Sequence, residues 1–152
     1  MIFLGMLAAL LPLALGIILA GGNLLWFLEP VSLLAAVLSP LLCVAAGGFW
    51  TAFRKGLASV IGQAPLMEEG DIVEALHVFD LLGKMTLLAG FLTALAGAVM
   101  ILPHMGIPEK TGQGLAVAVI APVYGLFLAG FFYLPARKRL EILLGNQNSK
   151  GE

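Results

Sequence analysis

Charged residues are scarce in this chain. They make up only 11% of its 152 residues, whereas 61% are hydrophobic. A soluble domain of this size keeps a large fraction of its residues at the surface, so it cannot bury so much apolar surface. The net charge is -1, and no basic patch of the kind that binds nucleic acid is present. The composition excludes a nucleic-acid-binding protein or soluble enzyme domain and indicates an integral membrane protein.

Side chains for metal binding or covalent chemistry are also rare. The single cysteine, Cys43, lies in an apolar run, so it has no partner for an internal disulfide, and we interpret it as an inert packing residue. The two histidines, His77 and His104, are predicted on opposite sides of the membrane, which excludes a shared metal site. No phosphate-binding loop or nucleophile motif occurs. The sequence predicts no enzyme activity, cofactor or metal site.

Four uncharged apolar runs stand out, each close to the roughly 20 residues that a helix needs to cross a bilayer. They are Ile2 to Ala20, Val31 to Trp50, Met85 to Leu102 and Leu115 to Leu134. No Lys or Arg precedes the first run, so we expect a retained span rather than a signal peptide. The prediction is an all-α integral membrane protein with four transmembrane helices, forming a single domain over residues 1–152.

The basic residues predict the orientation of these spans. Seven of them lie between spans two and three or after span four: Arg54, Lys55, Lys84, Arg137, Lys138, Arg139 and Lys150. Lys110, between spans three and four, is the exception. The positive-inside rule therefore places the N and C termini and segment 54–84 in the cytoplasm. Trp26 and Trp50 are expected as anchors at the outer and inner boundaries.

The cytoplasmic segment 54–84 is expected to contain helices. Pro65 and two glycines predict a break between Gly62 and Gly70. Asp71 and Glu74 have the spacing of a capping box, so we expect a helix to begin there. Apolar residues with helical period follow, and the helix is predicted to continue into span three.

Small residues line one side of span four and a matching side of span three. On span four Gly114, Ala118, Ala121, Gly125 and Ala129 recur every three or four positions, and on span three the face comprises Gly90, Thr93, Ala94 and Gly97. Small residues let helices approach closely in lipid. Two interpretations stay open: packing within the chain's own bundle, or the wall of an ion path shared with a partner.

Polar groups within these spans are few, and each has two readings. The Thr93 hydroxyl either bonds back to a carbonyl one turn earlier or offers its oxygen to a passing proton or ion. Pro122 cannot donate to the Ala118 carbonyl and should bend span four, either for packing or to expose that carbonyl. No predicted span contains an acid or base, so another chain must supply the titratable group of any proton path.

Two segments resemble a known family. Gly16 to Leu34, GIILAGGNLLWFLEPVSLL, is similar to the first two spans of the MotA-type flagellar stator subunit. Pro108 to Pro135, PEKTGQGLAVAVIAPVYGLFLAGFFYLP, is similar to its last span and the preceding loop. ExbB and TolQ proteins share spans three and four but usually lack the extra N-terminal span, so the GGN turn favours the MotA branch.

The resemblance implies a pentamer in the bacterial inner membrane around a dimer of a MotB-like single-span partner. That partner supplies an essential aspartate and a peptidoglycan-binding domain. Ion flow past the aspartate is expected to drive rotation, with spans three and four lining the path. The implied pathway or partner-facing residues are Gly90, Thr93, Ala94, Gly97, Ala118, Ala121, Pro122 and Gly125.

The chain departs from the family pattern in several places. Family threonines fall at Ala94, Ala121 and Pro122, and the loss of their oxygens favours protons over sodium. The family proline that ends span four is kept as Pro135. The long cytoplasmic insertion that engages a rotor is reduced to a short loop, whose charged residues form either a small contact surface or a solvated face: Arg54, Lys55, Glu68, Glu69, Asp71 and Glu74.

The leading hypothesis is therefore a proton-driven stator or energising subunit, in flagellar motility or a related process. The alternative is a non-conducting pentameric scaffold that binds a single-span partner. An unrelated four-helix membrane protein is a third reading, which the two matching segments disfavour.

Overall fold

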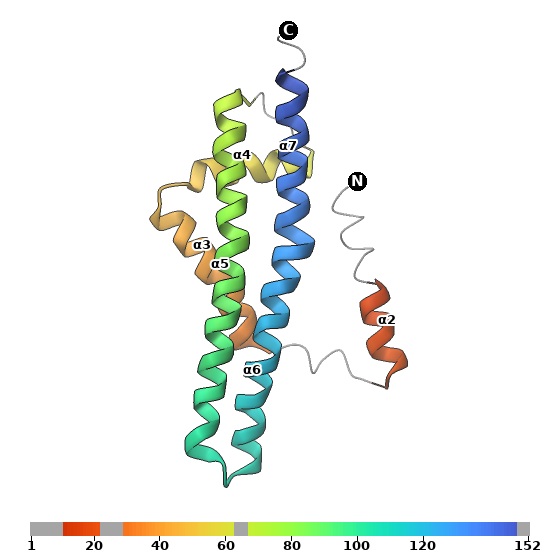
Figure 1. The fold of residues 1–152 in the computed structure, drawn as a ribbon, viewed down its shortest axis with the longest axis vertical. Coiled ribbons are helices and arrows are strands. Elements are labelled where there is room, and N and C mark those ends of the chain that lie inside the picture. The colour runs from red at the N-terminus through yellow and green to blue at the C-terminus, as the bar shows by residue number, and fades with distance from the viewer. Residues whose placement is uncertain (1–10, 22–28, 63–66, 149–152) are drawn as a thin grey trace.

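The regular structure is helical throughout residues 11–21, 29–62 and 67–148, which the computed structural model describes (Figure 1). Two long helical rods lie antiparallel. The first is α5 (Glu69–Ile101), and a 3-10 turn (Leu102–His104) leads to the second. The second rod comprises α6 (Pro108–Phe127), a π-helical segment (Leu128–Tyr133) and α7 (Leu134–Asn148). The predicted all-helical fold is confirmed.

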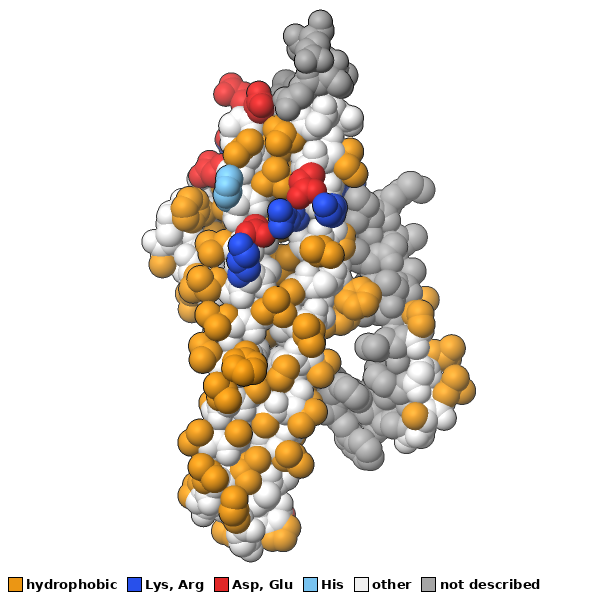
Figure 2. Space-filling model, in the orientation of Figure 1, with side chains coloured by type: hydrophobic (Ala, Val, Ile, Leu, Met, Phe, Trp, Pro, Cys, Tyr) orange, Lys and Arg blue, Asp and Glu red, His pale blue; other side chains and the backbone are white. Residues whose placement is uncertain are grey.

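The hairpin of α5 and α6–α7 has the composition of membrane-spanning helices. Glu69–His104 and Pro108–Gln147 are each long and apolar enough to cross a bilayer. On the face that Figure 2 shows, hydrophobic side chains cover the half of the hairpin near the α5–α6 turn, and the charged side chains gather on the other half. Exposed leucine and phenylalanine side chains suit contact with lipid. The number of spans and the sides of the termini stay predictions.

Two shorter helices pack against this hairpin. Helix α3 (Pro30–Ala46) runs obliquely along it, and α4 (Trp50–Ile61) lies across it (Figure 1). The predicted second span extended to Trp50, but α3 ends at Ala46, because Gly48 has φ +76° and turns the chain into α4. Cys43, interpreted as a packing residue, is exposed on α3.

The N-terminal part is described only from residue 11. Helix α2 (Leu11–Leu19) covers the second half of the predicted first span. The first half of that span lies outside the described residues, and so does the predicted outer anchor Trp26.

Helix α5 begins earlier than the sequence suggested. Its N-cap is Glu68 rather than Asp71, so the predicted capping box is wrong. The Asp71 carboxylate instead accepts two bonds from Lys55 Nζ, at 2.8 and 2.9 Å. The predicted break is confirmed at its first end, where Gly62 (φ +99°) caps α4. The predicted continuation of this helix into span three is also confirmed.

The second rod accommodates two prolines. Pro122 lies inside α6, and the helix continues on both sides of it. Pro135, expected to end span four, is instead the second residue of α7, which continues to Asn148. The π-helical segment ends at Tyr133, two residues before this proline. A proline lacks an N–H and clashes with the carbonyl four residues earlier, and the wider π turn relieves that clash.

An apolar core holds α3, α4, α5 and α7 together at the charged half of the molecule. It includes Val44, Ala52, Ile72, Phe79, Leu82, Tyr133 and Leu140. Ring centroids are 6.0 Å apart for Phe53 and Phe79 and 6.4 Å apart for Phe79 and Tyr133. This aromatic series ties α4 to both rods, so α4 is a fixed part of the fold.

Candidate functional site

The small residues of α5 and α6 face each other inside the chain. A Cβ atom added at Gly90 would lie 2.9 Å from the Ala121 carbonyl oxygen and 3.2 Å from Gly125 Cα. One added at Gly125 would lie 3.1 Å from the Thr86 carbonyl oxygen. Real Cβ contacts are rarely this short, so the two helices touch backbone to backbone at this level.

The contact continues towards the turn that joins the helices. A Cβ atom at Gly97 would lie 2.6 Å from the Ala118 nitrogen and 2.9 Å from the Gly114 carbonyl oxygen. Gly90, Gly97, Gly114 and Gly125 are all buried, as is Ala121. The glycine contact therefore runs along most of the apolar hairpin.

This arrangement supports the packing interpretation of the small-residue faces. Ala94, Ala118 and Pro122 are half-buried beside the same contact. Because the glycine surfaces are occupied by the chain's own second helix, a partner helix would meet the sides of the hairpin rather than these glycines. The assignment of the eight residues to an ion pathway stays a prediction.

The hydroxyl groups of α5 behave differently from one another. Thr93 Oγ1 donates to the Ala89 carbonyl oxygen at 2.8 Å, which confirms the first of its two readings. Thr86 is fully buried, and its hydroxyl lies beside that of Tyr133. Buried polar groups are usually paired, and this contact links α5 to the π-helical segment.

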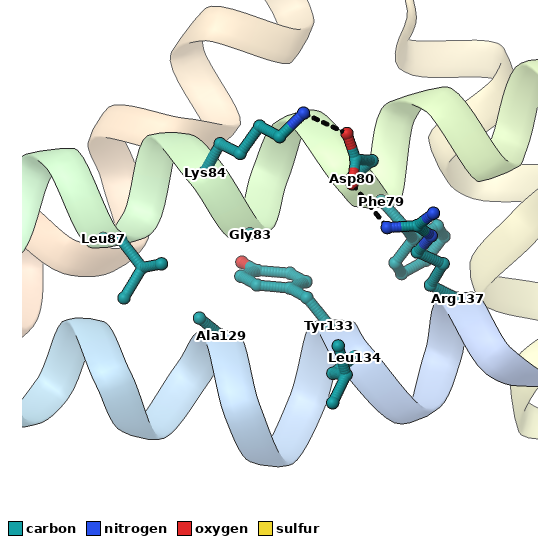
Figure 3. A pocket seen from close by; sticks show the side chains of 9 residues that line it. All are labelled: Phe79, Asp80, Gly83, Lys84, Leu87, Ala129, Tyr133, Leu134 and Arg137. Carbon is teal, nitrogen blue, oxygen red and sulfur yellow. Dashed lines mark hydrogen bonds and ion pairs between the residues drawn. The ribbon is translucent and has the colours of Figure 1, made fainter.

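A cluster of charged residues joins the two rods where the apolar half of the hairpin ends. Asp80 of α5 accepts from Lys84 at 2.6 Å and from Arg137 of α7 at 2.7 Å (Figure 3). Arg137 also contacts Glu141 at 3.1 Å, and Lys138 contacts Glu141 at 2.8 Å. The Asp80 carboxylate thus bridges cations from both rods, where the apolar half of the molecule ends.

A shallow groove lies beside this cluster. It has a volume of about 160 Å³, and apolar side chains such as Leu87 and Leu134 share its lining with Asp80 and Arg137. Gly83 and Ala129 contribute almost no side chain, which leaves the hollow between the two rods (Figure 3). Apolar groups therefore meet charged groups within one site, as expected at a membrane boundary.

The Asp80 carboxyl is held in its charged form. The hydrogen bond from Lys84 lowers its pKa from the ordinary 3.8, and the positive charge of Arg137 adds to the effect. Since the pKa is lower in the folded state, the ion pairs stabilise the fold at and above neutral pH. That contribution is lost as the pH falls below 3.8 towards the folded-state value.

We expect Asp80→Asn to destabilise the protein by about 1 kcal/mol or less at neutral pH, because solvent screens this half-exposed pair. The difference from the native chain should disappear on acidification through the range given above. Thermal unfolding in detergent as a function of pH checks this, with the exposed Glu109→Gln as the control. A difference that stays constant with pH would contradict the assignment.

Sequence reasoning did not single out this cluster. Its local signals were present, because Asp80 and Lys84, and likewise Arg137 and Glu141, have the i,i+4 spacing of helical ion pairs. The pair from Asp80 to Arg137 joins residues 57 positions apart, and no local pattern reports such a contact.

The predicted cytoplasmic contact residues lie on α4 and at the start of α5, and their role as a contact surface stays a prediction. Lys55 and Asp71 pair with each other, and the hydrogen bond that Lys55 donates to Asp71 raises the pKa of Lys55. Arg54 lies on the exposed face of α4, and Glu68, Glu69 and Glu74 are exposed at the start of α5. In residues 11–21, 29–62 and 67–148 no group of His, Cys, Asp and Glu is placed to hold a metal ion.

Comparison with known proteins identifies the family. Residues 52–151 match the model of the MotA/TolQ/ExbB proton channel family, and this match covers α4 from Ala52 onward and the whole hairpin of α5 and α6–α7. The search of curated proteins gave no match. The matched region is about two-thirds of the sequence and contains both long apolar helices. The chain therefore belongs to the MotA/TolQ/ExbB proton channel family, whose members have a general role as proton channels in membranes.

Proposed function

We propose that this chain is the A-type subunit of a proton-driven energising complex. It forms a proton channel together with a MotB-like single-span partner and converts proton flow into rotation or other mechanical work. The observation that carries the proposal is the family match over α4 to α7. The complex is expected in the bacterial inner membrane. Several copies of this chain, five according to the resemblance, are expected to surround the partner.

The distribution of charge in the hairpin supports a partner-dependent channel. No acid or base occurs between Lys84 and His104 on the first rod, or between Lys110 and Arg137 on the second. A proton crossing along this apolar stretch needs a titratable group. Within the family-matched region the chain offers none there, so the partner's aspartate is the natural donor and acceptor.

The N-terminal helices support the MotA branch of the family. Helices α2 and α3 precede the matched region, which begins at Ala52. Their segment resembles the first two spans of a MotA-type subunit, whereas ExbB and TolQ proteins usually have one span fewer. The short α4–α5 connection offers little surface for a flagellar rotor, so we propose mechanical work without assigning it to flagellar motility.

Proton flux from co-expressed chains tests this function. The partner is the product of the adjacent gene, expected to encode one span, an aspartate near its start and a peptidoglycan-binding domain. In vesicles that contain both chains, an imposed pH gradient should produce flux. Replacing the partner's aspartate with asparagine should abolish that flux, because the apolar stretch then has no titratable group from the partner.

Two controls make the result decisive. Vesicles with this chain alone measure the background proton leak. The aspartate→glutamate variant of the partner keeps the carboxylate and should retain some flux. A stable complex without flux would favour the non-conducting scaffold, for which the glycine faces serve packing alone. Flux that is unaffected by the aspartate→asparagine change would contradict the channel mechanism.

A further inference from the structure

An acidic side chain of this chain lies at an unexpected depth. The sequence places Glu29 before the second span, at the outer membrane boundary. In the structure the Glu29 backbone N–H donates to the Tyr124 hydroxyl at 3.3 Å. Tyr124 lies near the middle of the predicted span Leu115 to Leu134 on α6. Helix α3 therefore starts beside the middle of the hairpin's apolar stretch rather than at its end.

The arrangement of the helices agrees with this depth. Helix α3 lies along the part of the hairpin nearer α4, and the hairpin extends well past the start of α3 towards the α5–α6 turn (Figure 1). That uncovered part carries large exposed apolar side chains such as Leu95, Val99 and Val119. Such a surface belongs in hydrocarbon, so Glu29 lies within the thickness of the bilayer.

The Glu29 carboxyl has polar neighbours at this depth. As the N-cap of α3, it accepts from Val31 N at 3.2 Å and from Ser32 N. The side chain of Ser32 is fully buried, and its hydroxyl lies beside the Glu29 carboxyl. This hydroxyl lies close enough to the carboxyl to stabilise its charge. The Ser32 hydroxyl and the N–H groups of the first turn of α3 thus hold the carboxyl in place at this depth.

Other titratable groups do not face this position. On α5 no acid or base lies between Lys84 and His104, and on α3 none lies between Glu29 and its end at Ala46. On α6 the titratable side chain beside Glu29 is Tyr124. Among the described residues, the charge on Glu29 thus has no counter-ion at this depth.

We propose that Glu29 is a proton-binding site within the membrane, carried by this chain itself. It deepens the proposed proton-channel function, on which it rests for its membrane setting, and it adds a second acid to that of the partner. In the binding step, a proton passes from water to a carboxylate oxygen of Glu29 and forms the neutral acid, and release reverses it.

Two opposing effects make this binding reversible. The N–H groups of the first turn of α3 and its helix dipole stabilise the carboxylate. The surrounding hydrocarbon and the lack of a counter-ion stabilise the neutral acid. A carboxyl without the N–H donors would stay protonated in lipid, and one at the aqueous surface would stay ionised at neutral pH. Glu29 is subject to both effects, so both forms are accessible.

Carbodiimide labelling of the full chain in phosphatidylcholine vesicles tests the position and the protonation. These reagents react with the protonated carboxyl, so labelling should fall about tenfold for each pH unit above the midpoint. The apolar dicyclohexylcarbodiimide should modify Glu29, and a water-soluble carbodiimide should modify it far more slowly than Glu109. Glu109 is a matched control, because it lies in the first turn of α6 but is exposed.

Infrared difference spectra between acidic and alkaline pH provide an independent readout. The protonated-carboxyl absorption, to which every carboxyl contributes at acidic pH, should contain a component that is missing in Glu29→Gln, shifted in Glu29→Asp and distinct from the component missing in Glu109→Gln. Glutamine and aspartate both keep an acceptor for the first turn of α3, so the variants should fold, which circular dichroism verifies.

Rapid labelling of Glu29 by the water-soluble reagent, or an infrared component of Glu29 that coincides with that of the exposed Glu109, would overturn the proposal. Both experiments use this chain without its partner. A failure of partner-dependent flux therefore leaves the proton site standing, and a failure of the proton site leaves the channel proposal standing.

Discussion

Gly97→Ala is expected to destabilise the hairpin by about 1–3 kcal/mol, the usual cost of overpacking a closely packed contact. The added methyl group would lie 2.6 Å from the Ala118 nitrogen and 2.9 Å from the Gly114 carbonyl oxygen. Both atoms belong to the backbone, so no side chain can move aside and the helices themselves must separate. Van der Waals contact is the main attraction between helices in lipid, and separation weakens it along the whole pair.

Gly112→Ala is the matched control. Gly112 lies on α6 as well, but an added Cβ atom there has nothing within 4 Å. Because alanine favours a helix over glycine by up to about 1 kcal/mol, this variant should be neutral or slightly more stable. Thermal unfolding of the two purified variants in the same detergent decides the question. Equal stabilities would show that the α5–α6 contact is looser than the structure indicates.

Deleting Gly130 together with Pro135→Ala is expected to preserve the fold, although it removes a residue from the middle of a long helix. The π-helical segment Leu128–Tyr133 contains one residue more per turn than an α-helix. Loss of Gly130 turns that segment into regular α-helix, and the helical parts before and after it keep the same sides toward α5. The pair between Arg137 and Asp80 should therefore survive.

Two further variants isolate the cause. Deletion of Gly130 with Pro135 retained should cost about 3 kcal/mol, because the proline ring then meets a carbonyl in a regular helix. Deletion of Val119, an exposed residue of α6, should cost more than about 4 kcal/mol, because it rotates Ala121 and Gly125 away from Gly90. Thermal unfolding measures all three. Equal losses for the two single deletions would show that the π segment does not absorb a change of register.

The sequence predicted the helices well where local patterns of residues decide them. The helical continuation from the cytoplasmic segment into span three, the break at Gly62 and the Thr93 back-bond all follow from local patterns. The corner at Gly47 and Gly48 was missed because glycine is common inside membrane helices. The role of Asp71 was missed because its partner, Lys55, lies on another helix.

The candidate site was less predictable than the fold. Small residues at helical spacing indicate a close contact but do not identify which helix makes it, and here the contact is within the chain. Asp80 and Arg137 come together only when the two rods align along their length. The depth of Glu29 depends on the oblique course of α3, which no periodicity in the sequence encodes.

The short turn between α5 and α6 has a consequence for how the protein is made. The two helices leave the ribosome in direct succession, and their glycine contacts are local in the chain, so we expect them to pair early. Helix α3 is synthesised before them, but the surface against which Ala36 and Pro40 are buried is complete only afterwards. The order of assembly thus reverses the order of synthesis: α3 is made first but packs only after α5 and α6 have paired.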